Sequence, residues 1–405
     1  MTTLSPLDGT RKLIGVGAFV LFHGVKLVYR FGAEMKRTAS QSCEVAPVRL
    51  AIAFAITLSA AACGAEPTVS RRLEQAIASA PPREQAPMSC SSATLGPGAA
   101  ATSSANAGPP TPPRKGVPGE RAVLVEFYQS TRGANWVKQD NWLSESVDQC
   151  QWHGVECDDA GYVAQLTLYD NDLDGPLPES LCRLEHLHTL YFSFNRIRGE
   201  LPKNLGQCKS LKNLWLKANN LTGKIPDGIC ASGTLEYIDL HVNSLSGPIP
   251  ESIGKCSALQ VLRLDRNKLT GGVPKALFSL PKLSEIYLHH NKLSGALAPD
   301  IAKVHELQYL FLGDNEFSGP IPPLTALTEL VTLRLENNRF SGAVPPSLGE
   351  LPKLQVLRLD HNRLAGDVPP ALAQTTAKLG ECDLSGNKIT CPACNPRCGV
   401  QGRQK

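Results

Sequence analysis

The fold is decided by the stretch LWLKANNLTGKIP at residues 214–226, because its pattern returns ten times along the chain. The pattern reads L-x-L-x-x-N-x-L-x-G-x-(I/L/V)-P and runs from residue 161 onward. Its asparagine recurs every 24 residues, apart from one interval of 23 and one of 25, at Asn171, Asn195, Asn219, Asn243, Asn267, Asn291, Asn315, Asn338, Asn362 and Asn387. Such a period predicts a solenoid, in which each turn buries its apolar face against its neighbours.

The first half of the pattern predicts a strand and an inward turn. In L-x-L the two leucines point into the core and the residue between them points outward, as Leu214 and Leu216 do around Trp215. Stacked strands lie roughly 4.8 Å apart, so ten turns predict a concave parallel sheet of about 45 Å. The asparagine is expected to turn inward, where its amide can bond backbone groups of the turns above and below.

The second half of the pattern predicts a tight turn and extended backbone. In most turns glycine follows the asparagine by four residues, which a positive φ or a close backbone approach would explain. Proline follows three residues later and favours extended backbone. The sixth turn departs from this, with Ala298 in the proline place and Pro299 after it. We expect a local irregularity there and no change of fold.

The consensus resembles the plant-type class of leucine-rich repeats, most closely at residues 219–226 (NNLTGKIP). The preceding segment is similar to the N-terminal cap of the same proteins, with ERAVLVEFY at 120–128, GANW at 133–136, DNWL at 140–143 and CQWHGVECDDAGYVAQL from Cys150. The resemblance covers about residues 120–390. It implies an α/β repeat solenoid, a curved horseshoe with a parallel concave β-sheet and a cap at each end.

The resemblance implies binding without fixing the ligand. Members of the family include receptor-kinase ectodomains, receptor-like proteins, polygalacturonase-inhibiting proteins, and secreted or lipid-anchored proteins of bacteria and algae. The Gly-x-Asn-Trp element of the cap looks more like the bacterial and algal members. Because no kinase domain or apolar span follows residue 390, a receptor kinase is not expected.

The N-terminal region predicts export. Basic residues at 35–37 (MKR) precede an uncharged apolar run at 50–62, which is the form of a secretory signal peptide. The residues AAAC at 60–63 also resemble a lipoprotein box in which Cys63 is lipidated, although leucine is usual where Ala60 stands. An ordinary cleaved signal and an uncleaved anchor remain alternatives, as do Met1 and Met35 for the start of translation.

The sequence therefore divides into five segments. Residues 64–119 are rich in Pro, Ala, Ser and Gly, with too few large apolar groups to offset the entropy of ordering. The predicted segments are an N-terminal extension with signal or anchor (1–63), a flexible linker (64–119), the N-terminal cap (120–160), ten repeats (161–390) and a C-terminal cysteine-containing cap and tail (391–405).

Thirteen cysteines are an odd count, so at least one is expected to lack a disulfide partner. In the cap, Cys150 and Cys157 are predicted to form a disulfide, because a cap has little core of its own. Four others stand at equivalent places two turns apart and are predicted to be buried free thiols: Cys182, Cys230, Cys208 and Cys256.

The last four cysteines lie at the end of the solenoid. Cys382 replaces the first leucine of the tenth L-x-L and is predicted to be core. Cys391, Cys394 and Cys398 favour a cap disulfide plus one spare thiol. Zinc is the alternative, although a fourth ligand is missing nearby.

The sequence gives no sign of catalysis, a metal site or a cofactor. It contains no Gly-rich phosphate loop, nucleophile elbow, H-E-x-x-H or calcium loop. The spacing puts His241 and His289 roughly 10 Å apart, too far to share a zinc ion. Asp239, Asp265 and Asp360 line the same face, with no pocket expected to raise their pKa. A net charge of +4 spread along the chain predicts no nucleic-acid partner.

The candidate site is the outward row of the concave sheet, which is rich in residue types that dominate binding hot spots. That row reads Thr167, Tyr191, Trp215, Asp239, Arg263, Tyr287, Phe311, Arg334, Arg358 and Asp383, and His241 and His289 stand in the next row. The sequence predicts a peptide or protein ligand along Tyr191 to Arg358, with aromatic rings stacking and arginines pairing acidic groups. A polysaccharide is the alternative ligand, and a third interpretation is that these large side chains merely cover backbone.

Taken together, the sequence predicts an exported, non-catalytic recognition module, secreted or held at a membrane only through its N-terminal segment. An inhibitor of a secreted hydrolase and a structural or adhesion protein are the rival functions. Asn220 begins the chain's N-glycosylation sequon, Asn220-Leu221-Thr222.

Overall fold

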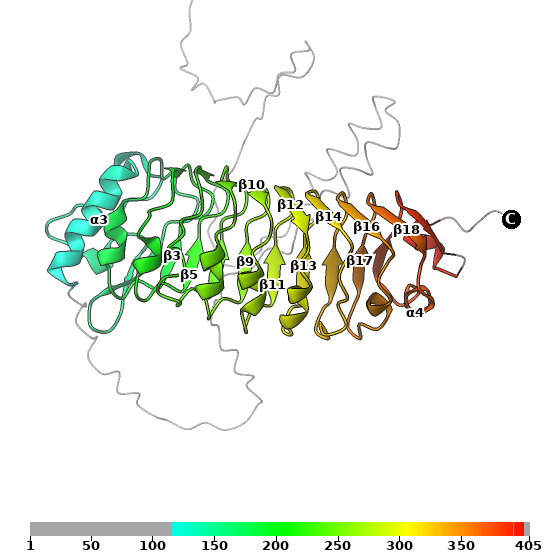
Figure 1. Cartoon of the computed structure of the whole chain (residues 1–405). Coiled ribbons are helices and arrows are strands. Elements are labelled where there is room, and N and C mark those ends of the chain that lie inside the picture. Colours follow the sequence, from blue (N-terminus) through cyan, green and yellow to red (C-terminus); the bar gives the residue numbers. More distant parts are fainter. Residues whose placement is uncertain (1–115, 392, 401–405) are drawn as a thin grey trace, which may run out of the picture. The chain divides into compact units, whose positions relative to one another are not determined.

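The computed structural model describes residues 116–391 and 393–400, which form a solenoid of stacked turns (Figure 1). Each turn contributes one strand to an eleven-stranded sheet, in the order β1-β2-β3-β5-β7-β9-β11-β13-β15-β17-β19. The first pair is antiparallel and all the others are parallel. The strands are β1 (Val155–Cys157), β2 (Val163–Thr167), β3 (Thr189–Tyr191), β5 (Asn213–Trp215), β7 (Tyr237–Asp239), β9 (Val261–Arg263), β11 (Glu285–Tyr287), β13 (Tyr309–Phe311), β15 (Thr332–Arg334), β17 (Val356–Arg358) and β19 (Glu381–Asp383).

A second set of strands follows the asparagine of each turn. It forms a seven-stranded parallel sheet, in the order β20-β18-β16-β14-β12-β10-β8, and a separate pair, β4-β6. These strands are β4 (Arg198–Gly199), β6 (Asn220–Leu221), β8 (Ser246–Gly247), β10 (Lys268–Gly271), β12 (Lys292–Ala296), β14 (Glu316–Gly319), β16 (Arg339–Gly342), β18 (Arg363–Asp367) and β20 (Lys388–Thr390).

Short helices complete most turns on the side away from the concave sheet. They are η3 (Glu179–Arg183), η4 (Leu205–Gln207), η5 (Glu251–Lys255), η6 (Lys275–Ser279), η7 (Pro299–Lys303), η8 (Pro346–Gly349) and α4 (Pro370–Thr375). The last turn ends in η9 (Pro396–Cys398). Within the described residues, no helix has the length and apolar character needed to cross a membrane.

The predicted alternation of L-x-L is confirmed. Leu214 and Leu216 are fully buried, whereas Trp215 between them is half-buried on the concave face. The buried leucines, isoleucines and phenylalanines of all turns form one continuous core. Each turn therefore contributes the same small share of apolar burial, and only stacking makes that share large enough to stabilise the fold.

The asparagine ladder is present, and its bonds have a direction. Oδ1 of Asn195 accepts hydrogen bonds from the backbone N–H groups of Asn171 and Leu173 in the preceding turn. Nδ2 donates to the carbonyl oxygens of Leu168 in that turn and of Phe192 in its own. The expectation of bonds to turns on both sides was wrong in this detail, because each amide serves the preceding turn and its own.

Each turn uses two left-handed backbone positions, of which the sequence predicted one. The glycine four residues after the asparagine has positive φ, as in Gly223 with φ 76°. The residue just before the asparagine is also left-handed and is seldom glycine, as in Val242 with φ 55°. A β-branched residue there is strained, because its Cβ crowds the backbone.

The irregular sixth turn keeps its fold. The helices of neighbouring turns begin directly after a proline, whereas η7 begins after Ala298, and Pro299 occupies its first position. Proline fits the first position of a helix because no backbone N–H is needed there. The shift of one residue is therefore absorbed.

The N-terminal end is closed by helix α3 (Pro118–Ser130), η1 (Gly133–Asn135) and η2 (Gln149–Gln151). Four of its aromatic rings pack together and onto Phe192 of the solenoid, namely Phe127, Trp136, Trp142 and Trp152. The predicted disulfide between Cys150 and Cys157 is present, with Cα atoms 5.5 Å apart. It closes the loop that leads into the antiparallel strand β1.

The predicted free thiols are the main error of the sequence reasoning. Disulfides join Cys182 to Cys208 and Cys230 to Cys256, each across one turn with 26 residues of separation. The 48-residue spacing rightly excluded bonds between equivalent positions. It did not exclude a bond to the residue that follows the helix of the next turn, from Cys182 in η3 and from Cys230 in a turn without a helix. The bonded residues lie 4.5 and 4.9 Å apart between Cα atoms.

The C-terminal cysteines pair as well. Cys391 bonds Cys394, which confirms the predicted cap disulfide. Cys398 is not spare, because it bonds Cys382, and Cys382 is therefore not a simple core thiol. Cys63, the signal segment and the predicted linker up to residue 115 lie outside the described residues. The predicted end of the linker at residue 119 is wrong by two residues, because helix α3 begins at Pro118.

Candidate functional site on the concave face

The structure brings the predicted outward residues into one row. Parallel pairing sets Tyr191 beside Trp215, Trp215 beside Asp239, and so on turn by turn to Arg358 beside Asp383. We call this the first row. Its members are half-buried, so each presents part of its side chain to the concave surface. The residues two positions later form the second row, with His241, Asp265, His289 and Asp360.

At one end lies an N-terminal aromatic cluster, which consists of Tyr169, Tyr191, Phe194 and Trp215. Its ring centroids are 5.4 Å apart for Tyr169 and Tyr191, 5.3 Å for Tyr169 and Phe194, and 4.8 Å for Tyr191 and Trp215. Tyr169 and Phe194 are 46% and 44% exposed, which is unusual for rings of this size. The cluster is thus an open aromatic surface.

Phe194 is the residue of this cluster that sequence reasoning missed. It occupies the left-handed position before Asn195, with φ 59°. A bulky residue in that conformation is strained, and strain of this kind concentrates at functional sites. The available signal was the residue type, since the equivalent places hold residues such as Asp170, Ala218 and Arg266.

Three strands further on lies a C-terminal aromatic pair, Tyr287 and Phe311, whose stacked rings are 4.6 Å apart. A guanidinium group lies over each ring. That of Arg263 is 4.7 Å from the centre of Tyr287, and that of Arg334 is 5.7 Å from the centre of Phe311. The arginines therefore hold the pair from both sides through cation–π contacts.

The arginines of the first row already have acidic partners. Arg263 pairs with Glu285 at 3.3 Å, Arg334 with Glu381 at 3.0 Å, and Arg358 with Asp360 at 3.0 Å. Glu285 and Glu381 lie two residues before the first-row residue of their strands. Because alternate residues of a strand share a face, the sequence pattern could have placed both glutamates on the concave face. An acidic ligand group would have to compete with these carboxylates.

Buried charge in the second row is concentrated at Asp265. Burial raises the pKa of this carboxyl to about 6, although the nearby His241 opposes the shift. The expectation that no carboxyl of this face has a raised pKa was wrong for Asp265. It holds for Asp360, where hydrogen bonds from Arg358 and His361 outweigh burial and lower the pKa.

Two histidines flank Asp265. Nε2 of His289 lies 3.5 Å from Oδ2 of Asp265, and burial lowers the pKa of His289 to about 3. On the other side, Nδ1 of His241 lies 2.5 Å from Oδ1 of Asp239. In the described part of the chain, no three His, Cys, Asp or Glu side chains lie close enough to hold a metal ion.

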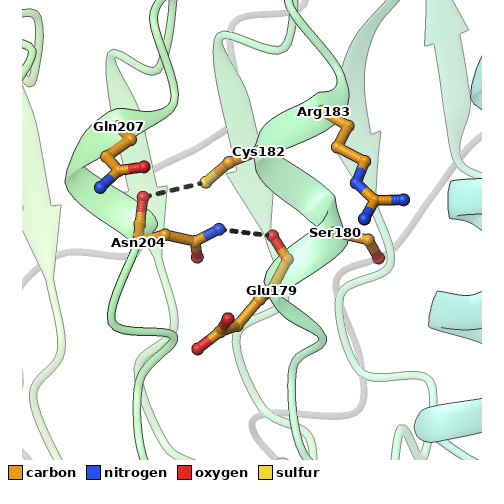
Figure 2. Close-up of a pocket in the computed structure, with 6 residues that line it drawn as sticks. All are labelled: Glu179, Ser180, Cys182, Arg183, Asn204 and Gln207. Carbon is orange, nitrogen blue, oxygen red and sulfur yellow. Dashed lines mark hydrogen bonds between the residues drawn. The ribbon is translucent and has the colours of Figure 1, made fainter.

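A shallow hollow of about 290 Å³ lies on the helical side, between η3 and η4 (Figure 2). Nδ2 of Asn204 donates a hydrogen bond to the carbonyl oxygen of Glu179 at its floor. Sγ of Cys182 lies 3.4 Å from the carbonyl oxygen of Asn204, but it is bonded to Cys208 and has no thiol hydrogen to donate. The remaining lining residues are Ser180, Arg183 and Gln207. The hollow is a gap between two helices on the side of the solenoid away from the first row.

The solenoid matches known repeat proteins along most of its length. Leucine-rich repeat family models match residues 186–208, 210–232, 233–293, 257–317, 329–351 and 353–375. Receptor-like protein kinase 7 of Arabidopsis thaliana is 33% identical over 94 residues, which are 23% of this chain and 10% of that protein. The chain spans a tenth or less of the length of this and similar curated relatives.

Three solved structures resemble the solenoid. The ectodomain of the Arabidopsis receptor kinase GASSHO1/SCHENGEN3, in complex with CASPARIAN STRIP INTEGRITY FACTOR 2, has a TM-score of 0.64 and 32% identity, over 67% of this chain and 33% of that one. The Arabidopsis HAESA ectodomain with a peptide hormone ligand has a TM-score of 0.59 and 31% identity, over 67% and 46%. A plant ice-binding protein has a TM-score of 0.58 and 27% identity, over 68% and 89%.

These matches agree with the repeat consensus, the parallel concave sheet and the asparagine ladder. The same architecture supports both peptide receptors and an ice-binding protein, so the fold alone does not decide the function. The chain is a leucine-rich repeat protein of the plant-type class.

Proposed function

We propose that this protein is a non-catalytic recognition module that binds a peptide along its concave face. The observation that carries the proposal is the presence of two half-exposed aromatic pairs in the first row, Tyr191–Trp215 and Tyr287–Phe311, separated by the polar first-row residues of β7 and β9. Large rings held open on a rigid sheet are the anchors that dominate binding energy at interfaces. The similar HAESA ectodomain is bound to a peptide hormone ligand, and the similar GASSHO1/SCHENGEN3 ectodomain is bound to CASPARIAN STRIP INTEGRITY FACTOR 2, which supports a ligand-binding use of the fold.

The geometry indicates what kind of peptide fits. Trp215 on β5 and Tyr287 on β11 are three strand steps apart, which is about 14 Å. An extended peptide spans that distance with about four residues. Between the two anchors the first row presents Asp239, which pairs with His241, and Arg263, which pairs with Glu285. A ligand with two apolar side chains about four residues apart and a polar residue between them fits this surface.

The proposed setting is extracytoplasmic. Five disulfides join all ten cysteines of the described residues, and such bonds persist in oxidising compartments. The N-terminal signal segment and lipidation at Cys63 are part of this proposal. Intact mass of the protein from its native host decides between them, since a mature chain that begins at a diacylated Cys63 supports a lipoprotein. Retention of residues 1–62 would remove both the signal cleavage and the lipoprotein.

The binding proposal is tested by selecting ligands from a displayed library of random dodecapeptides with the full chain. Trp215→Ala and Tyr287→Ala, made separately, are each expected to weaken binding of a selected peptide by at least tenfold, because each removes a central aromatic anchor. The matched control is Tyr162→Ala, which removes a cap tyrosine stacked on His186 at 4.0 Å, outside the first row.

Three outcomes are informative. Loss of binding in both first-row variants with an unchanged control supports the concave face. Full binding in either variant removes that anchor from the proposal. Failure to select any peptide, together with first-row-dependent binding on an array of neutral glycans, would replace the peptide by a sugar ligand.

A further inference from the structure

The seven-stranded sheet carries a second regular surface that the concave face does not use. Figure 1 shows its strands β10 to β18 following one another along one edge of the solenoid. The residue directly after each ladder asparagine is cationic in five of six successive turns of this sheet. These positions hold Lys268, Lys292, Glu316, Arg339, Arg363 and Lys388.

The strand register places a hydroxyl beside most of these cations. The Cα partners are Ser246 with Lys268, Thr270 with Lys292, Ser318 with Arg339 and Ser341 with Arg363. Partners on parallel strands point to the same face of a sheet. Four of the five cations therefore have a hydroxyl of the preceding turn at their side, which is a suitable pair for one anionic group, although the hydroxyl of Ser246 also donates to the carbonyl oxygen of Gly223.

The positive charge of this surface is largely uncompensated. Lys268, Lys292, Arg363 and Lys388 are exposed and form no ion pair among the described residues. Arg339 is the exception, since it bonds Glu316 at 3.0 Å. In the first turns the equivalent Arg196 is likewise neutralised, by Asp172 at 3.0 Å. The unpaired cations therefore lie on β10 and β12 and on β18 and β20, on either side of the Glu316–Arg339 ion pair.

The register also fixes how the cations are spaced. Successive strands are staggered by two residues, because Lys292 pairs with Thr270 and not with the equivalent Lys268. One strand step of about 4.8 Å and a stagger of about 6.6 Å together give roughly 8 Å between equivalent positions. The cations form a straight diagonal stripe, which we call the basic stripe. Along the sequence these charges are evenly spread, and they form a stripe only when the turns stack.

We propose that the basic stripe binds a linear acidic polysaccharide, with one carboxylate or sulfate group at each cation–hydroxyl pair. A long polyanion satisfies many such pairs at once, and each contact releases bound counterions. Single-stranded nucleic acid is disfavoured because binders of that kind interleave aromatic side chains with the cations. In the described chain, the exposed large apolar residues are Val137, Leu143, Tyr169, Phe194 and Val242, and none of them lies on this sheet. The stripe therefore offers nothing for bases to stack on or for a lipid bilayer to receive.

The test uses the full chain with polygalacturonate as the carboxylate probe, heparin as the sulfate probe and dextran as the uncharged control. The stripe variant combines Lys268→Ala, Lys292→Ala and Arg363→Ala. The matched control combines Lys203→Ala, Lys255→Ala and Lys282→Ala, three exposed lysines outside the stripe with the same change in net charge. Melting temperatures of both variants verify that they fold.

The stripe variant is expected to lose about a hundredfold in affinity for a charged probe, at about fivefold for each cation near an anionic surface. The dependence of log affinity on log salt concentration should flatten in the stripe variant and keep its slope in the control. Trp215→Ala should leave probe binding unchanged, so failure here is separate from failure of the peptide proposal.

If the stripe variant and the control variant lose equal affinity for the charged probes, net charge alone explains the binding and the proposal is overturned. It is also overturned if the wild-type protein binds dextran as well as it binds the charged probes. Tighter binding of oligothymidylate or of phosphatidylserine vesicles than of either polysaccharide would assign the stripe to another class of partner.

Discussion

The clearest energetic prediction concerns two aspartates at equivalent places, Asp265 and Asp360, each two residues before its ladder asparagine. Both are buried, at 6% and 2% exposed. Burial raises the pKa of Asp265 from 3.8 to about 6, whereas Arg358 and His361 lower that of Asp360 despite its burial. Neutralising the two side chains should therefore change stability in opposite directions.

In the wild-type protein, the folded state binds a proton at Asp265 more tightly than the unfolded chain does. The ionised carboxylate therefore costs folding free energy at pH 7, and that cost disappears as the pH falls from about 6 to about 4. A pKa raised from 3.8 to about 6 corresponds to at most about 3 kcal/mol. The variant should be more stable than wild type at pH 7 by up to that amount, and the difference should vanish near pH 4.

For Asp360→Asn, the sign is reversed. A carboxyl whose pKa is lowered by folding contributes stability when the pH is above the ordinary pKa of the unfolded chain. This contribution is lost as the pH falls through the folded-state pKa. The variant should lose stability at pH 7, because the guanidinium of Arg358 keeps no carboxylate partner at Asp360. Urea denaturation followed by far-UV circular dichroism, with the disulfides intact, measures both variants at pH 7 and pH 4. A gain for Asp265→Asn that is equal at both pH values would refute the reasoning, since ionisation could then not be its source.

Two further predictions use the same assay. Replacing both Cys182 and Cys208 with serine should lower stability by about 3.5 kcal/mol, the loop entropy of a 26-residue separation, and an unchanged midpoint would contradict the disulfide. Val242→Gly should raise stability by about 1 kcal/mol, because glycine adopts φ near 55° without the crowding of a β-branched side chain, and a loss would show that the strain is absent.

The repeat architecture could be predicted from the sequence because each turn repeats the same pattern of apolar residues, asparagine and glycine. Leu214, Asn219 and Gly223 have one structural role each, and ten copies of that arrangement confirm one another. The first row follows from the alternation of side chains along a strand, so the sequence alone places residues such as Trp215 and Tyr287 on the concave face.

What the sequence did not predict depends on contacts between neighbouring turns. The Cys182–Cys208 bond joins two inequivalent places, and a comparison of equivalent positions does not reveal it. The raised pKa of Asp265 and the partner carboxylates of the arginines likewise come from side chains that meet only when turns stack. Phe194 was missed because the left-handed position before the asparagine is glycine only in the last turn, at Gly386, so no regular glycine marks it.

The one-way bonding of the asparagine ladder gives the molecule a mechanical polarity. Each amide closes the turn before it, down to Asn387, whose Oδ1 accepts from the N–H of Leu364. When the chain is unfolded from its C-terminal end, each turn that leaves takes with it the asparagine amide that bonds the backbone N–H groups of the preceding turn. Those N–H groups then lack a partner, and the preceding turn is destabilised in its turn. Unfolding from the N-terminal end removes only backbone groups that were bonded by the next asparagine, and the later turns keep their own hydrogen bonds. A single-molecule pulling experiment should therefore measure a lower unfolding force from the C-terminal end than from the N-terminal end.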